Sequence, residues 1–213
     1  MEIYFSTFLH DIMAIITIMN PLAAASIMVG MVTSVTPSTM KPIALKATFT
    51  VIVASLLTLF SGEFFFKLFG INVLSLKVIG GIILMLIAVK MVHGEHKTSR
   101  HSDEESDEAQ DKEDISVIPL GIPILFGPGL IATITVLHDT HKHQFNMMIS
   151  YSLITTAILF SSLIVYLTLR YAGSINKMLG LIGMKILTRI MGLIVGAIAA
   201  QFLVSGIKGL WLN

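Results

Sequence analysis

The sequence predicts an all-α membrane protein with six transmembrane helices arranged as two inverted repeats of three. Of its 213 residues, 54% are apolar and only 13% are charged, whereas about a quarter of the residues of a soluble domain carry charge. Six apolar runs reach the roughly 20 residues that a helix needs to cross about 30 Å of hydrocarbon. Lipid cannot hydrogen-bond to a backbone, and the alternation typical of barrel strands is absent, so we expect helices.

The six expected spans use most of the chain and leave short connections and one charged segment between them. We expect the first span to be a retained helix rather than a cleaved signal peptide. It is preceded by the acidic Glu2 and lacks the basic segment with which a signal peptide begins. Asn20-Pro21 interrupts the first span, and Gly127-Pro128 interrupts the fourth. In chain order the expected spans are 12–33, 43–62, 73–93, 115–137, 147–169 and 190–207.

The net charge of +1 is the sum of two very different parts of the chain. Residues 94–114 hold nine acidic and three basic side chains, whereas the other 192 residues hold four acidic and eleven basic ones. We therefore expect an acidic, disordered cytoplasmic loop, 94–114, between two membrane repeats, 1–93 and 115–213. Nucleic acid is not an expected partner. The absence of cysteine excludes disulfides and thiolate chemistry.

The distribution of Lys and Arg among the connections predicts the orientation, because cytoplasmic loops are enriched in these residues. The connections after the first, third and fifth spans hold ten of them, and those on the other side hold four. We therefore expect both termini outside and the acidic loop in the cytoplasm. The ten are Lys41, Lys46, Lys90, Lys97, Arg100, Lys112, Arg170, Lys177, Lys185 and Arg189, and the four are Lys67, Lys77, Lys142 and Lys208.

The second half of the chain resembles the first. At an offset of 107 residues, Asn20-Pro21 aligns with Gly127-Pro128, and Ser26 aligns with Thr133. Each half contains three spans, an odd number, so the second half enters the membrane upside down, as in the inverted repeats of secondary transporters. A second stretch agrees at an offset of 111, where Ile79, Gly81, Ile83, Ile87 and Ala88 align with Ile190, Gly192, Ile194, Ile198 and Ala199.

Each proline pair predicts a new helix start near the middle of the membrane. Asn20 and Gly127 are suitable N-caps, and Pro is favoured at the first helical position because its missing N–H needs no partner there. The N–H groups of residues 22–24 and 129–131 then have no intrahelical partner and, with the helix dipole, form a cradle for a small carboxylate. The alternative is a simple proline kink at a packed helix crossing. The candidate binding residues are Asn20, Pro21, Leu22, Ala23, Ala24 and Ser26 in the first half and Gly127, Pro128, Gly129 and Thr133 in the second.

Three further side chains are weaker candidates. The hydroxyl of Thr17, like the hydroxyls of the two half-helices, can contact a ligand or bond back to its own helix, which is the commoner arrangement. Gln201 is expected to turn inward toward a polar partner. Asp11 can carry a coupling proton, but the leading expectation places it and His10 in the headgroup region, in contact with water.

Short motifs of small and apolar residues occur in a distinctive order along essentially the whole chain. They are Asn20-Pro21-Leu22, Phe69-Gly70-Ile71, Gly80-Gly81-Ile82-Ile83-Leu84, Pro119-Leu120-Gly121-Ile122-Pro123-Ile124-Leu125, Gly127-Pro128-Gly129 and Arg189-Ile190-Met191-Gly192-Leu193, followed by Gln201 and Gly206. In these motifs the sequence resembles the MarC family of six-helix bacterial and archaeal membrane proteins. It departs from the family at Ala23 and Ser26, where a Gly and a second Pro are usual.

The resemblance implies a secondary transporter of small neutral amino acids such as glycine, alanine or serine, in the cytoplasmic (inner) membrane of a prokaryote. We expect alternating access around a midplane site, with one three-helix repeat rocking against the other. The expected partners are a small-molecule substrate and the lipid bilayer, and a homo-oligomer is left open. No cofactor is expected, and the coupling ion, H⁺ or Na⁺, is also left open.

The alternative function is a non-transporting scaffold or regulatory protein that acts through its acidic loop. An enzyme is not expected, because the spans lack a pair of Asp residues, a His-Glu metal motif and a Ser–His arrangement. The His-rich stretch 93–101 belongs to the charge-rich segment that is expected to be disordered, and the stretch 138–143 lacks a fourth defined ligand, so no metal site is expected.

Overall fold

The computed structural model of the chain describes residues 2–32, 34–94 and 114–212, and in these residues every regular element is helical. Residues 95–113, which contain nearly all of the acidic segment, lie outside the described residues, so the disorder expected for 94–114 stays a prediction. The elements are α1 Glu2–Met19, α2 Pro21–Met31, α3 Pro37–Leu68, α4 Val73–His93, the 3₁₀ turn η1 Asp114–Ser116, the π-helical segment η2 Val117–Leu125, α6 Pro128–Gln144, α7 Met147–Arg170 and α8 Ala172–Leu212.

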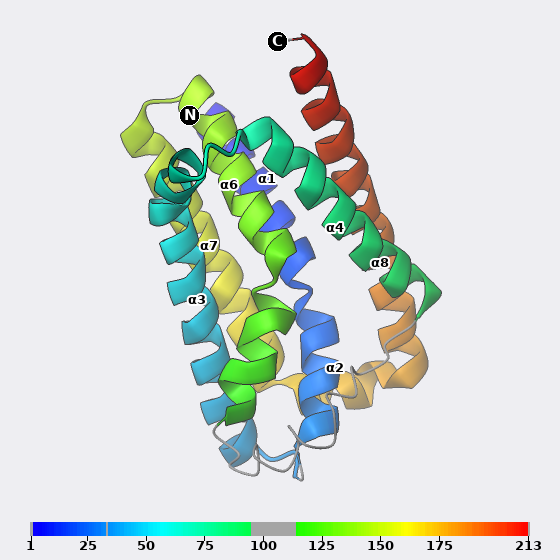
Figure 1. The fold of residues 1–213 in the computed structure, drawn as a ribbon. Helices are drawn as coiled ribbons and strands as arrows, with labels where there is room; N and C mark the ends of the chain where they lie inside the picture. The colour runs from blue at the N-terminus through cyan, green and yellow to red at the C-terminus, as the bar shows by residue number, and fades with distance from the viewer. Residues whose placement is uncertain (1, 33, 95–113, 213) are drawn as a thin grey trace.

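The lengths and composition of these helices confirm the all-α membrane class. Five helical stretches are long and apolar enough to cross a membrane, with α1 and α2 counted as one. The segments η2 and α6, which meet at a bend of 49°, make a sixth when taken together. Both ends of the described chain lie at the same end of the bundle (Figure 1), which we call the terminal end.

Helix boundaries follow capping signals in the sequence. Asn72 and Asn146 cap α4 and α7, and each side-chain oxygen accepts a hydrogen bond of 2.9 Å from the N–H two residues later. At its other end α4 stops at Gly94, whose φ of 73° lies in the left-handed region that glycine adopts without strain. The expected span 73–93 therefore coincides with α4.

The segment before the second proline pair is not the regular α-helix that the expected span 115–137 implies. In η2 the backbone leaves helical values at Ile118 (φ −125°, ψ 124°) and Ile122 (φ −130°, ψ 125°). Each of these residues precedes a proline, Pro119 or Pro123, and proline disfavours the α conformation in the residue before it. The half-span is therefore wide and irregular.

The last helix begins well before the expected span 190–207. α8 starts at Ala172 and breaks at Gly180, whose φ is 62°. Its first part runs across the end of the bundle opposite the terminal end, and the rest continues to Leu212 (Figure 1). The early start was missed because the residues before the break are partly polar and form no 20-residue apolar run.

The interior divides into two hydrophobic clusters. The larger one joins α1, α2, α3, η2, α6, α7 and the first residue of α8, Ala172, and the smaller one lies between α4 and the later part of α8. The antiparallel pair α4–α8 shares the most extensive helix–helix contact in the described bundle, and the two helices lie side by side in Figure 1. Ile18 packs against both clusters. The α4–α8 pair is therefore a distinct unit that contacts the rest of the bundle near Ile18.

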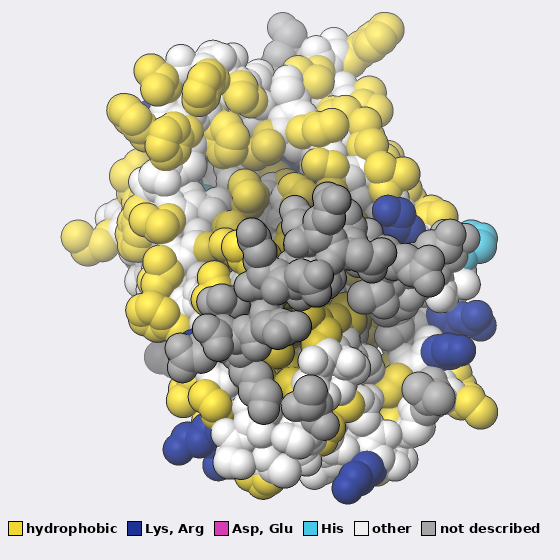
Figure 2. Space-filling model, turned by 60° about the horizontal axis from the view of Figure 1, so that its bottom comes forward, with side chains coloured by type: hydrophobic (Ala, Val, Ile, Leu, Met, Phe, Trp, Pro, Cys, Tyr) yellow, Lys and Arg dark blue, Asp and Glu magenta, His cyan; other side chains and the backbone are white. Residues whose placement is uncertain are grey.

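The outer surface of the bundle is apolar, as a protein in lipid requires. Large side chains such as Phe49, Phe64 and Leu193 are about two-thirds exposed, at 68%, 65% and 65%. Figure 2 turns the end opposite the terminal end forward and shows yellow apolar side chains over the flanks, with Lys and Arg gathered around the margin of that end.

Candidate functional site

The first predicted helix break is present at Asn20. Its backbone adopts the left-handed conformation (φ 45°, ψ 63°), and α2 starts directly after it with Pro21 in the first turn. Asn is among the few non-glycine residues that enter this region at low cost. Its Oδ1 accepts a hydrogen bond of 3.4 Å from the N–H of Ala23, and its Nδ2 lies 3.9 Å from Met91 Sδ of α4. Asn20 therefore caps α2 and contacts α4.

The second predicted break is present at Gly127. This residue is extended (φ −105°, ψ 176°), and α6 begins at Pro128 without a side-chain cap. The N–H groups of Leu130 and Ile131 both donate to the carbonyl oxygen of Gly127, at 3.0 and 3.3 Å. The chain therefore turns by a glycine here, and by a left-handed asparagine in the first half.

The expected set of unpaired N–H groups is too large. Ala23 donates to the Asn20 side chain, and Ala24 donates to the Asn20 carbonyl at 3.2 Å. With Leu130 and Ile131 bonded to Gly127, four of the six N–H groups have partners. Among the described residues, Leu22 and Gly129 keep their N–H groups without one. The prediction overcounted because the fourth residue after a cap already makes the first helical bond.

The two breaks lie beside each other. A Cβ placed on Gly129 would lie 3.6 Å from Ile18 Cγ2, and Ile18 is only two residues before Asn20. The same Cβ would lie 2.7 Å from Leu84 Cδ2 of α4. Helix α4 thus passes both breaks, with Leu84 against Gly129 and Met91 against Asn20. The Gly129 position is closed in this conformation.

Other candidate residues are placed differently. Ser26 donates a 3.3 Å hydrogen bond to Oδ1 of Asn176 in α8, so it joins two helices. Thr133 donates to the Gly129 carbonyl at 2.9 Å, which is the back-bonded arrangement. Thr17 is buried. Pro21 is also buried, whereas Pro128 is exposed.

The prediction that Gln201 turns inward is wrong. Gln201 is exposed on α8. The inward side of α8 at this level is filled by tight contacts with α4, where a Cβ on Gly81 would lie 2.8 Å from Leu203 Cγ and 2.9 Å from the Ala199 carbonyl. No room is left there for a long polar side chain.

The expectation that Asp11 contacts water is also wrong. The Asp11 side chain has no exposed surface, and its Oδ1 lies 3.3 Å from Nε2 of His141, which is 3% exposed. His10 lies on the outside, with 72% of its side chain exposed and its Nδ1 3.7 Å from the same oxygen. Helix α6 continues to Gln144 and covers the Asp11 face of α1, which the sequence pattern did not indicate.

Buried hydroxyl groups on α3 and α7 are a feature that sequence reasoning missed. Thr48 and Ser55 of α3 and Ser161 and Ser162 of α7 are buried, and their oxygens have no hydrogen-bond partner among the described residues. Ser55 and Ser162 are 107 residues apart, which is the offset of the repeat. Applying that offset to polar residues would have found this pair.

Other hydroxyls of the same helices behave differently. Thr58 of α3 donates to Ala54, and Thr168 of α7 donates to Ile164, each to the carbonyl four residues earlier. Bonding back in this way satisfies a hydroxyl in a helix without any outside partner. An unsatisfied buried hydroxyl is costly, so Ser55 and Ser162 require an explanation of their own.

Neighbouring contacts give the depth of Ser55. A Cβ on Gly121 of η2 would lie 3.1 Å from Thr50, and one on Gly62 would lie 3.7 Å from Oγ1 of Thr135 in α6. Thr50 and Gly62 are both on α3, and Ser55 lies between them along the helix. It is therefore at the depth of the chain between Gly121 and Thr135, which contains the second break.

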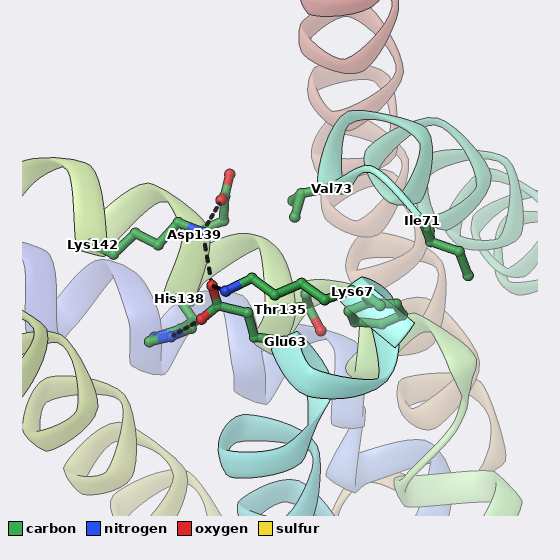
Figure 3. Close-up of a pocket in the computed structure, with 9 residues that line it drawn as sticks. Glu63, Lys67, Ile71, Val73, Thr135, His138, Asp139 and Lys142 are labelled. Atoms are coloured by element: carbon green, nitrogen blue, oxygen red, sulfur yellow. Dashed lines mark ion pairs between the residues drawn. The ribbon is translucent and has the colours of Figure 1, made fainter. Parts of the chain in front are cut away.

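A charged pocket lies at the terminal end, where α3 and α6 end and α4 begins (Figure 3). Its volume is about 80 Å³. Glu63 is central, with Oε1 2.9 Å from Lys67 Nζ and 3.7 Å from Lys142 Nζ, and Asp139 lies 2.9 Å from Lys142. The pocket is lined by Glu63, Phe66, Lys67, Ile71, Val73, Thr135, His138, Asp139 and Lys142.

These features define a multi-pass, all-α integral membrane protein in which the first and fourth spans break mid-helix and meet. A family model described as "MarC family integral membrane protein" matches residues 5–211. The chain belongs to the MarC family, as the motifs in the sequence indicate.

Curated relatives from bacteria and archaea match over nearly the full length. A "UPF0056 membrane protein" of Aquifex aeolicus is 31% identical over 210 residues, covering 99% of this chain and 96% of the relative. YvbG of Bacillus subtilis is 33% identical over 212 residues, covering 97% of each chain. A Methanocaldococcus jannaschii protein is 36% identical over 197 residues, covering 92% and 93%. No solved structure matches the chain significantly.

Proposed function

We propose that this protein is a secondary transporter of small neutral amino acids of the glycine, alanine and serine class, and that it works by alternating access around a midplane site. One observation carries the proposal: both helix breaks are present, and the Gly129 position of one lies against Ile18, two residues from the Asn20 of the other. Broken helices that meet in the bundle interior are the usual architecture of substrate sites in secondary transporters.

The pairing of the helices supports an inverted repeat of 1–93 and 115–213. In such a repeat α1 corresponds to η2, α2 to α6, α3 to α7 and α4 to α8. The contacts occur in matching pairs, since α4 packs on α6 and α8 on α2, and η2 packs on α3 and α1 on α7. A pseudo-two-fold relation accounts for all four contacts.

The residues at the breaks suit a small substrate with a carboxylate. The N–H groups of Leu22 and Gly129 have no partner among the described residues, and both lie in the first turn of a helix, where the dipole favours an anion. Ala23, Ala24 and Gly127 add little side-chain volume. Leu84 closes over Gly129, so α4 must move before a ligand reaches this position.

The two hydrophobic clusters indicate which parts move. Helices α4 and α8 come from different halves but pack mainly on each other. We therefore favour movement of the α4–α8 pair against the rest of the bundle over the rocking of one half against the other. The interface of the two bodies contains Ile18 and Leu84, which are the side chains beside Gly129.

The unsatisfied hydroxyls of Ser55 and Ser162 complete the proposed substrate path. Each can donate to a carboxylate or accept from an ammonium group, and a bound amino acid would satisfy both. Ser55 lies at the depth of the second break, which supports this role.

The orientation follows the positive-inside rule. Near the helix ends opposite the terminal end lie Lys41, Lys90, Arg170, Lys177 and Lys185. We propose that this end is cytoplasmic, that both termini are outside, and that the protein resides in the cytoplasmic membrane of a prokaryote.

The proposal is tested with purified protein in lipid vesicles. Labelled glycine or alanine is expected to exchange with unlabelled amino acid held inside. Gly129→Val is expected to abolish exchange because its side chain collides with Leu84, whereas the control Gly30→Val has nothing within 4 Å of a Cβ and should exchange normally. Absence of exchange of any small amino acid by folded wild-type protein would overturn the proposal.

A further inference from the structure

We propose that Asp11 and His141 form a proton-binding site that couples substrate movement to proton movement. This inference rests on the proposed transport function. It starts from a carboxylate that is fully buried within a membrane-spanning helix, with a buried imidazole nitrogen 3.3 Å away. Ionisable groups within spans are costly and are commonly part of ion pathways.

The contact between the two side chains is unlike that of a structural ion pair. Neither oxygen of Asp11 has a hydrogen-bond partner among the described residues, and the same holds for Nδ1 of His141. A buried pair that serves only stability is expected to satisfy these atoms, because burial of a charge is repaid only by good geometry and further hydrogen bonds. Stability alone therefore does not explain the burial of Asp11 and His141.

A single proton neutralises this pair. It can reside on the carboxylate beside a neutral imidazole, or on the imidazole beside an anionic carboxylate, and the pair has no net charge in either state. Loss of that proton leaves an isolated buried carboxylate, which is strongly unfavourable in an apolar interior. While α1 and α6 are in contact, the pair can therefore hold one proton without net charge.

The surroundings offer a route for the proton but no competing charge. His10 is exposed and its Nδ1 lies 3.7 Å from Asp11 Oδ1, so it connects the buried carboxylate to the solvent at the terminal end. The other ionisable groups of α6 nearby are engaged elsewhere: His138 lies 3.7 Å from Glu63, and Lys142 contacts Glu63 and Asp139. At the end of α6 the pair meets an aromatic ring, since Phe145 lies edge-on to His141.

The same surroundings favour a proton over a metal cation. A hard cation such as Na⁺ binds several oxygen ligands, whereas the buried group that faces the Asp11 carboxylate is an imidazole nitrogen. One carboxylate and one imidazole are sufficient for a proton.

Coupling follows from the position of Asp11 on the helix that also carries the substrate site. Asp11 and Asn20 are nine residues apart on α1, or about 13 Å along the axis. Helix α6 packs on the moving α4–α8 pair, where Ala132 meets Gly80. Movement of that pair on substrate binding would shift the terminal end of α6 against α1, hydrate Asp11 and release the proton to the entering solvent.

The test uses wild-type protein in vesicles that contain a pH-sensitive dye. An imposed alanine gradient is expected to drive proton flux in the wild type. Asp11→Asn, which keeps the shape of the side chain, should retain alanine exchange and lose roughly tenfold or more of the proton flux per alanine moved. His141→Gln is a second variant with the same expectation. The control Glu2→Gln changes an exposed acid of the same helix and should leave both measurements unchanged.

The outcomes separate this inference from the proposed function. Wild-type exchange without alanine-driven proton flux would overturn the coupling site and leave the transport proposal standing. Undiminished proton flux in both Asp11→Asn and His141→Gln would also overturn it. Absence of exchange in the wild type would overturn the transport proposal and the coupling with it.

Discussion

The position of Asn20 makes two structural requirements that few residue types satisfy together. Its backbone is left-handed, and its side chain caps α2 through Ala23. Glycine meets the first demand without meeting the second, and Ala meets neither. The identity of this residue therefore decides whether α1 and α2 remain separate helices with a fixed angle between them.

Substitutions at Asn20 should separate the two demands. Asn20→Ala loses the cap and also the polar side chain that lets asparagine adopt the left-handed conformation at low cost, and we expect it to lower the free energy of unfolding by about 2 kcal/mol. Asn20→Gly loses only the cap and should cost less than half of that. Thermal unfolding in detergent measures both. Equal losses in the two variants would show that the backbone conformation contributes nothing.

The serines at the repeat offset predict an opposition between stability and transport. Ser55→Ala and Ser162→Ala remove unsatisfied buried hydroxyls and should leave stability unchanged or raise it, by up to about 1–3 kcal/mol. The apparent affinity for substrate should fall roughly tenfold, which corresponds to about 1.4 kcal/mol. Thr168→Ala is the control, since this hydroxyl already bonds to Ile164. Unchanged transport in both serine variants would limit them to a packing role.

At the scale of elements, the close packing of α4 against α8 depends on glycines, because a side chain at these positions would collide with the backbone of the other helix. A Cβ on Gly81 would lie 2.9 Å from the Ala199 carbonyl and 3.0 Å from the Leu203 nitrogen, and backbone atoms cannot move aside. At Gly196 the nearest atom is Ala88 Cβ at 3.4 Å, an ordinary contact. Small residues that permit such approach are typical of helix pairs in membranes.

These two glycines therefore make a matched pair of substitutions. Gly81→Ala should destabilise the protein by about 1–3 kcal/mol, because it forces α4 away from α8. Gly196→Ala should be neutral or slightly stabilising, because Ala is the better helix former. Thermal unfolding in the same detergent compares them. An equal effect of both would mean that α4 and α8 pack less closely than the distances imply.

The sequence predicts some elements far better than others, for physical reasons. Apolar runs and caps identify α4 at its boundaries, and the proline pairs locate both breaks, because these signals are local. The irregular backbone at Ile118 and Ile122 was missed, although Pro119 and Pro123 signal it locally. The burial of Asp11 and the exposure of Gln201 depend on which helix packs on which face. That information is absent from the composition of either helix, so these predictions failed.

At the scale of the whole molecule, the two hydrophobic clusters predict two bodies that move relative to each other. Helices α4 and α8 form one body, and α1, α2, α3, η2, α6 and α7 form the other. If transport depends on their relative movement, a link within one body should be harmless, whereas a link between the bodies should arrest the cycle. The chain has no cysteine, so an introduced pair can form only one disulfide within the chain.

Two cysteine pairs make this comparison. Ala88→Cys with Gly196→Cys links α4 to α8, where the Cβ positions are 3.4 Å apart, close to the roughly 3.5–4.5 Å of a disulfide. Gly80→Cys with Ala132→Cys links α4 to α6, where a Cβ on Gly80 lies 2.5 Å from that of Ala132, so these helices must separate by about 1 Å. Alanine exchange in vesicles is measured before and after reduction, so the reduced form of each variant is the reference for its oxidised form. Oxidation should leave exchange by the first pair unchanged and stop exchange by the second until the disulfide is reduced. Arrest of exchange by both disulfides would show that α4 also moves against α8, and would favour the two inverted halves as the moving units, because each link joins one half to the other.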